Sequence, residues 1–331
     1  MMVHLGQAPV ATPMSSVLEW GCPIVHAMAG TVAKAVSPGA DQALPSNLMP
    51  VLGFAFAAGV VSAGATVAVE RFGGRVGGIL GTVPTTIMPA TMGLFATHPM
   101  DADGTSSEGF LRSVAMVPAG MMLNAAFLAS WRVLPTWLHA DDSRTTLWRC
   151  VAASLAVWAL LSLAWVLAMN AIEPSVEALL AIGGGTLVAT ATLGIVLCRH
   201  GVPAPKGTNH VTWPVLVARG VAAGGAIAVA LVTARSGHAI AGGMAVTFPA
   251  IFLTTIVGTW LAQGREVPVG AVGPMVLGSC AVGSYAMLSG LLYPRLGLVL
   301  GTPACWVLAV GCVSVPAGLW LRAHRMRSDQ E

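Results

Sequence analysis

Two threonine–proline sequences, each inside a long apolar stretch, are the positions where this chain could do chemistry. They are Thr82-Val83-Pro84 and Thr247-Phe248-Pro249, and each follows a pair of glycines. Proline lacks an amide N–H and clashes with the preceding turn, so it kinks a helix and frees a backbone carbonyl. We expect the carbonyls of Leu80 and Ala245 to be freed in this way. Freed carbonyls beside hydroxyl groups are suited to binding a polar solute or a desolvated cation.

Further hydroxyl and amide side chains surround both prolines. The candidate substrate-binding residues combine a helix break with hydrogen-bonding groups deep in apolar segments, and they are Thr82, Pro84, Thr85, Thr86, Asn124, Thr247, Pro249, Thr254 and Thr255. A structural interpretation stands beside this one, because threonine next to proline often re-satisfies the backbone and glycine pairs often mark tight packing. The sequence leaves both interpretations open.

The elements that carry these residues must lie in a membrane. Of the 331 residues, 56% are hydrophobic and only 9% are charged, whereas soluble domains are about 25% charged. This composition excludes a cytosolic enzyme and a disordered scaffold. A net charge of +3, scattered along the chain, also excludes nucleic acid as a partner. The 39 glycines and 21 prolines are typical of a transmembrane bundle.

Runs of about 20 mostly apolar residues predict nine transmembrane helices. They are 48–69, 75–97, 110–134, 146–169, 177–197, 213–233, 238–262, 268–292 and 296–321. We expect turns between them, the first at Glu70–Gly74 and the last at Pro294-Arg295. The segment 17–36 carries Glu19, His26 and Lys34, which favours a helix lying at the interface or against the bundle over a tenth span.

The positive-inside rule predicts the orientation of these spans. With nine spans, 12 of the 16 basic residues fall on one side and 4 on the other. The C-terminus is therefore expected in the cytoplasm, in an integral multi-pass membrane protein. Pro84 lies nine residues after Arg75, and Pro249 lies eleven after His238. At 1.5 Å per residue, both prolines reach about the middle of a hydrocarbon core about 30 Å thick, from opposite sides.

The chain contains an internal repeat at a shift of 165 residues. Gly77, Gly78, Thr82, Pro84 and Gly93 correspond in this shift to Gly242, Gly243, Thr247, Pro249 and Gly258. Spans one to four thus match spans six to nine, and the odd fifth span between them forces the two units into opposite orientations. The predicted fold is an all-α polytopic membrane protein with two inverted four-helix repeats joined by a linker helix. Its expected parts are an N-terminal segment (1–47), the first repeat (48–170), the linker (171–199), and the second repeat with a cytoplasmic tail (200–331).

Enzyme signatures are lacking in the sequence. It has no H-E-x-x-H motif, no aspartate cluster for a metal and no Ser/His/Asp set at membrane depth, so we expect neither an enzyme nor a cofactor. Asp141-Asp142 is expected to be a solvated turn, and Gly183–Gly185 a close-packing surface. Arg219 and Glu177 lie near span ends, where we expect them to reach the membrane surface.

The stretch from Glu70 to Thr85, Glu-Arg-Phe-Gly-Gly-Arg-Val-Gly-Gly-Ile-Leu-Gly-Thr-Val-Pro-Thr, resembles the GlpM-like family of small bacterial inner-membrane proteins. That family consists of four-helix units with a similar glycine-pair-then-proline signature, and the chain looks like a duplicated form of it. The second copy departs from the signature at Arg235–His238. The resemblance implies a membrane protein and supplies no site residues.

These observations predict a secondary transporter of a small polar solute or a cation, working by alternating access between the two repeats. The alternative is a non-transporting membrane scaffold or assembly protein, and a lipid-modifying enzyme ranks third. The partners expected are the lipid bilayer, the solute, and a second copy packed through glycine-rich helix faces.

Overall fold

The computed structural model describes residues 48–80, 84–98, 107–200 and 213–328. Every regular element in these ranges is helical. The expected interfacial helix at 17–36 and the candidate Thr82 lie outside the described residues. The helices in chain order are α3 (Leu48–Leu80), α4 (Ile87–Thr97), α5 (Glu108–Ser130), α6 (Leu134–Trp137), α7 (Ser143–Ile172), α8 (Val176–Arg199), α9 (Trp213–Arg235), α10 (Ala239–Ala245), α11 (Ala250–Gln263), α12 (Glu266–Ala309), the π-helical turn η1 (Val310–Ser314) and α13 (Val315–Ser328).

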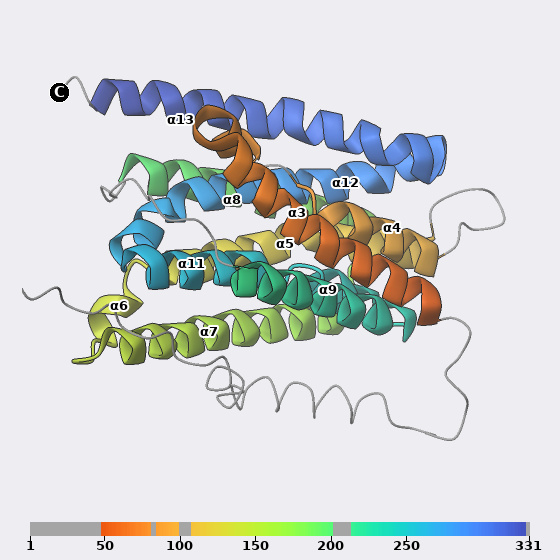
Figure 1. Ribbon diagram of the computed structural model, residues 1–331. Helices are drawn as coiled ribbons and strands as arrows, with labels where there is room; N and C mark the ends of the chain where they lie inside the picture. Colours follow the sequence, from red (N-terminus) through yellow and green to blue (C-terminus); the bar gives the residue numbers. More distant parts are fainter. Residues whose placement is uncertain (1–47, 81–83, 99–106, 201–212, 329–331) are drawn as a thin grey trace, which may run out of the picture. The chain divides into compact units, whose positions relative to one another are not determined.

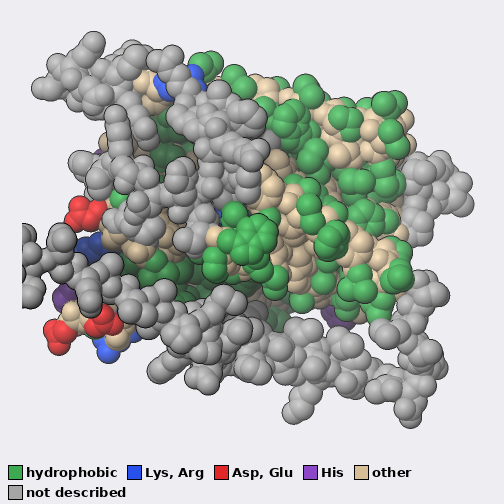
Figure 2. All heavy atoms as spheres, viewed as in Figure 1, with side chains coloured by type: hydrophobic (Ala, Val, Ile, Leu, Met, Phe, Trp, Pro, Cys, Tyr) green, Lys and Arg blue, Asp and Glu red, His purple; other side chains and the backbone are tan. Residues whose placement is uncertain are grey.

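Six helical segments of the described chain are long and apolar enough to cross a membrane. They are Glu108–Trp137, Ser143–Ile172, Val176–Arg199, Trp213–Arg235, Ala239–Leu261 and Glu266–Ala323, and Leu48–Gly64 and Ile87–Thr97 are shorter apolar helices. Large hydrophobic side chains are exposed along them, including Leu160, Leu163 and Leu167 of α7. Figure 2 shows hydrophobic side chains spread over one face, with most of its visible charged side chains toward the left end. The prediction of an all-α membrane protein is confirmed at this level.

Two predicted turns are placed differently. The turn expected at Glu70–Gly74 is wrong, because α3 continues through it to Leu80. Glycine inside a helix costs only about 1 kcal/mol, so a glycine pair permits a turn without enforcing one. The turn expected at Pro294-Arg295 falls slightly later, at Gly297 inside α12, where φ is 68° and ψ is 177°. Only glycine adopts this backbone conformation readily.

Helix α5 lies at the centre of the packing. In the most apolar 18-residue stretch of Glu108–Trp137, which contains α5, 78% is buried inside the protein. The corresponding share is 28% in each of α7 and α8 and 33% in α9. Helices α8, α10 and α12 pack closely against α5, and Figure 1 shows α5 between α7 and α8. The other helices therefore present apolar faces outward, as expected in lipid.

Glycines on the surrounding helices allow this close approach to α5. A Cβ atom on Gly183 of α8 would lie 2.7 Å from the carbonyl oxygen of Ala115. A Cβ atom on Gly243 of α10 would overlap the carbonyl oxygen of Ser113. The predicted close packing is confirmed at Gly183, whereas Gly184 and Gly185 face open space.

Candidate binding site at the helix breaks

The second threonine–proline sequence breaks its helix, as predicted. Helix α10 ends at Ala245, and α11 begins at Ala250 with Pro249 as its N-cap and no side-chain hydrogen bond to the cap. The prediction that the Ala245 carbonyl is freed is wrong, because it accepts a hydrogen bond from the Phe248 amide at 3.1 Å. After α10 the backbone forms tighter turns, in which Thr247 and Phe248 each donate to the carbonyl three residues earlier. One of these is the Ala245 carbonyl, which would have no donor in a continuous helix because Pro249 lacks an N–H.

Asn124 of α5 and Thr247 meet at this break. The Asn124 Nδ2 donates to the Thr247 carbonyl oxygen at 2.8 Å, and both residues are 1% exposed. The Thr247 hydroxyl donates to the Met244 carbonyl at 2.6 Å. Gly120 of α5 makes room for this side chain, because a Cβ atom there would overlap the hydroxyl. The structure thus brings together two predicted site residues that lie 123 positions apart.

The remaining polar atom of Asn124 is unsatisfied. Its Oδ1 is buried and has no hydrogen-bond partner. A buried acceptor without a donor costs about 1–3 kcal/mol, and such groups are uncommon in folded proteins. An N–H or O–H donor, or a cation, would satisfy this oxygen.

The first threonine–proline sequence also precedes a helix start. Pro84, Thr85 and Thr86 are non-helical and lead into α4 at Ile87. Pro84 is buried, and the two threonines are half-buried. Thr86 is the N-cap of α4, and its side chain makes no capping hydrogen bond. The first break therefore offers hydroxyl groups next to an uncapped helix start.

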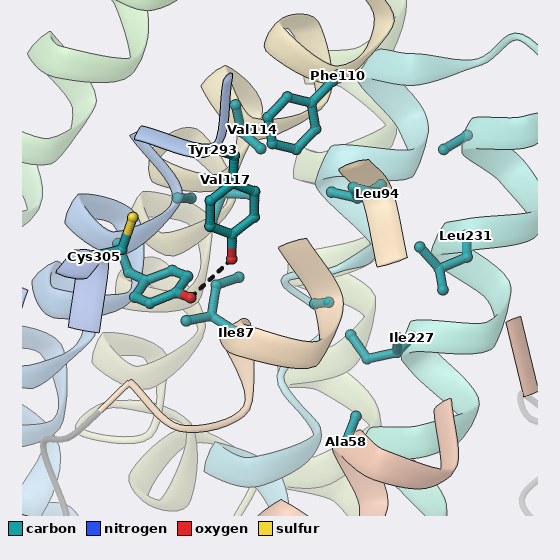
Figure 3. Close-up of a cluster of buried hydrophobic side chains, with 14 of the residues drawn as sticks. Ala58, Ile87, Leu94, Phe110, Val114, Val117, Ile227, Leu231, Tyr293 and Cys305 are labelled. Carbon is teal, nitrogen blue, oxygen red and sulfur yellow. Dashed lines mark hydrogen bonds between the residues drawn. The ribbon is translucent and has the colours of Figure 1, made fainter. Parts of the chain in front are cut away.

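One hydrophobic cluster connects the two breaks. Ile87, at the start of α4, belongs to it together with Val117 of α5. Val246, in the second break, packs against the same cluster. Figure 3 shows Ile87 and Val117 within it. One residue next to each break thus contacts the same hydrophobic cluster, even though the two segments are far apart in the sequence.

Thr254 and Thr255 bind a buried arginine. The Arg219 Nε donates to the Thr254 hydroxyl at 3.1 Å, and Nη2 donates to the Thr255 hydroxyl at 2.5 Å. Arg219 is only 8% exposed, so the expectation that it reaches the membrane surface is wrong. The threonines of α11 hold its guanidinium inside the protein, where α9 packs against α11.

A tyrosine pair on α12 was not predicted from the sequence. The two tyrosines of the chain, Tyr285 and Tyr293, share a hydrogen bond of 2.9 Å between their hydroxyls (Figure 3). The Tyr293 hydroxyl also lies 3.1 Å from the Thr91 hydroxyl of α4 and accepts from Thr302 at 3.3 Å. Both tyrosines are fully buried. Their spacing of eight residues, close to two helical turns, is the one signal that could have paired them.

These features define an integral membrane protein of the multi-pass helical class, with two helix breaks lined by polar groups. In the described ranges, no group of three or more His, Cys, Asp or Glu residues could hold a metal ion. Comparison with family models, with curated proteins and with solved structures finds no match to this chain. The likeness to the GlpM-like family therefore stays a prediction.

Proposed function

We propose that this protein is a secondary carrier that moves a small polar solute or a cation by alternating access. In this proposal, nine spans form two inverted four-helix repeats around a linker helix, and the C-terminus is cytoplasmic. The solute binds at the two breaks, between Thr82–Thr86 and Thr247–Thr255.

The observation that carries the proposal is the unsatisfied Oδ1 of Asn124 beside the second break. Inside a membrane, irregular backbone is tolerated only where protein or a water-filled cavity surrounds it. Transporters with broken helices use such breaks to bind solutes near the midplane. An acceptor left without a donor at this place fits a site that is complete only when a ligand is bound.

The positions of the breaks support the repeat. Helix α3 ends at Leu80 and α10 ends at Ala245, which are 165 residues apart, and the sequence identities have the same shift. Each end is followed by a proline and then by a short apolar helix, α4 or α11. Corresponding breaks in two halves are the sequence feature most typical of inverted-repeat transporters.

The scaffold alternative also has an observation in its favour. The backbone of α5 is in direct contact with α10, where Gly243 lies against Ser113, and the Ser113 hydroxyl donates to the Ala239 carbonyl at 3.0 Å. A permanent contact of this kind would prevent the movement that a carrier needs.

Thiol accessibility in membrane vesicles of known orientation separates the two functions. The starting variant has its six cysteines replaced, and single cysteines are then introduced as Thr85→Cys or Ala250→Cys. Ser143→Cys and Ser236→Cys, both exposed and at opposite ends of the expected topology, report the two aqueous sides. Ala58→Cys, fully buried in the described packing, is the control for a dry position.

We expect an impermeant reagent to label position 85 or 250 from both sides, and position 58 from neither. Labelling from both sides means that the midplane opens alternately to each face. If positions 85 and 250 resist labelling from both sides as position 58 does, the breaks are dry and the carrier proposal fails in favour of the scaffold. Opposite labelling of positions 143 and 236 tests the orientation separately.

A further inference from the structure

A hollow of about 390 Å³ lies away from both helix breaks, where the start of α5, the end of α7 and the start of α10 meet. Its volume is within the range of small-molecule sites, about 300–1,000 Å³. The residues around it come from all three helices and from the turns that follow α7 and α9, and they include Arg112, Met169, Glu173, His238 and Ile240.

The hollow presents charges of both signs. The Arg112 guanidinium uses one edge to bind Glu108, with Nε at 2.9 Å and Nη2 at 2.7 Å from the same carboxylate oxygen. Its Nη1 makes no hydrogen bond with the residues that the structure describes. The Glu173 carboxylate, in contrast, makes no hydrogen bond or ion pair with the residues that the structure describes. A ligand with one negative and one positive group could engage both side chains.

The backbone at Glu173 does not favour a glutamate. Its φ of 49° and ψ of 53° place it in the left-handed region, where it is the only non-glycine residue of the described chain with positive φ. It is the C-cap of α7, and glycine is the usual residue in this conformation at a helix end. Glycine adopts this turn more easily than glutamate does, so the turn conformation does not require the glutamate side chain. Strained residues of this kind cluster at ligand sites.

The hollow also has an apolar wall. Met169 and Ile240 line it, and they are 8% and 7% exposed. An apolar group of a ligand would be in contact with both side chains and would leave water on binding. Polar side chains stand at the more exposed part of the hollow, since Glu173 and His238 are open to solvent.

We propose that this hollow binds a small zwitterion that carries an apolar group, of the α-amino acid type. The ligand carboxylate binds Arg112, the ligand ammonium binds Glu173, and the apolar group lies on Met169 and Ile240. Hydrogen bonds between charged groups are stronger than neutral ones, so each charged end adds to the affinity. This binding does not depend on the proposed transport.

Calorimetric titration of the purified full-length protein in lipid nanodiscs with leucine tests the proposal. Two analogues are matched controls: 4-methylpentanoate lacks the ammonium group, and 3-methylbutylamine lacks the carboxylate. We expect leucine to bind, and each analogue to bind at least about tenfold more weakly, because each loses one charge-assisted contact.

The Glu173→Gly variant separates binding from folding, since glycine suits the backbone there. We expect this variant to melt at or above the temperature of the unchanged protein, yet to bind leucine at least about tenfold more weakly. The proposal is overturned if leucine does not bind, if 4-methylpentanoate binds as tightly, or if Glu173→Gly binds leucine normally. The thiol-labelling result at positions 85 and 250 is unaffected by any of these outcomes, so the two proposals can fail separately.

Discussion

Replacing Gly243 with alanine tests the contact on which the second break rests. The new methyl group would meet the carbonyl oxygen, the carbonyl carbon and the Cα atom of Ser113. All three are backbone atoms of the central helix α5, so no side chain can rotate away. Helix α10 must then move outward, and the hydrogen bond from the Ser113 hydroxyl to the Ala239 carbonyl is stretched or lost.

The size of the effect follows from opposing contributions. Alanine in place of glycine favours a helix by about 0.5–1 kcal/mol. Overpacking a tight interface costs about 1–3 kcal/mol, and the lost hydrogen bond adds about 1 kcal/mol. We therefore expect Gly243→Ala to lower the free energy of unfolding by about 2 kcal/mol.

The matched control is the same substitution where space is available. Gly185 of α8 is exposed and has no atom within 4 Å of an added Cβ. Gly185→Ala should raise the free energy of unfolding by about 0.5–1 kcal/mol. Equilibrium unfolding in mixed micelles with increasing dodecyl sulfate, followed by tryptophan fluorescence, measures both variants. Equal stability of the two variants would refute the contact between α10 and α5.

Three further predictions concern other parts of the molecule. Asn124→Leu should change the free energy of unfolding by less than about 1 kcal/mol, because losing the donor to a backbone carbonyl is offset by removing the unsatisfied Oδ1; a loss above about 3 kcal/mol in the same unfolding assay would contradict this. Tyr285→Phe and Tyr293→Phe should each cost about 1 kcal/mol, and the double variant should cost less than their sum, because one hydrogen bond joins the two hydroxyls; strict additivity in unfolding would count against a shared bond. Hydrogen bonds from the backbone N–H and hydroxyl of Thr145 hold the pKa of Asp142 below its ordinary value of 3.8. Its stabilisation of α7 is therefore complete above pH 3.8 and is lost as the pH falls through the lower pKa of the folded state. Asp142→Asn keeps the cap without the charge, so melting temperatures measured against pH should fall more steeply for the unchanged protein than for this variant.

Features that depend on local sequence were predictable. The apolar run 146–169 lies inside α7 (Ser143–Ile172), and 177–197 lies inside α8 (Val176–Arg199). The break before Pro249 was predictable because proline cannot continue the hydrogen bonding of a helix. Each of these features follows from residues close together in the chain.

Features that depend on tertiary contacts were not predictable. The burial of Arg219 requires Thr254 and Thr255 of another helix. No pattern in the local sequence predicts that α9 and α11 are in contact. Asn124 was a candidate because of its depth, but its bond to the Thr247 carbonyl joins residues 123 positions apart. A glycine pair predicted a turn at Gly73-Gly74 and marked a close contact at Gly243, since glycine allows both.

The central place of α5 has a consequence for how the protein is made. Helices α8, α10 and α12 bury α5, and the ribosome produces all three after it. The carbonyls of Ala239 and Thr247, which accept hydrogen bonds from Ser113 and Asn124, are synthesised about 110–120 residues after α5 ends. At about 5–20 residues per second, this delay is about 5–25 s. During that interval Ser113 and Asn124 face lipid or the insertion machinery. The nascent chain therefore needs a temporary binding partner for α5, the helix that later lies at the centre of the packing.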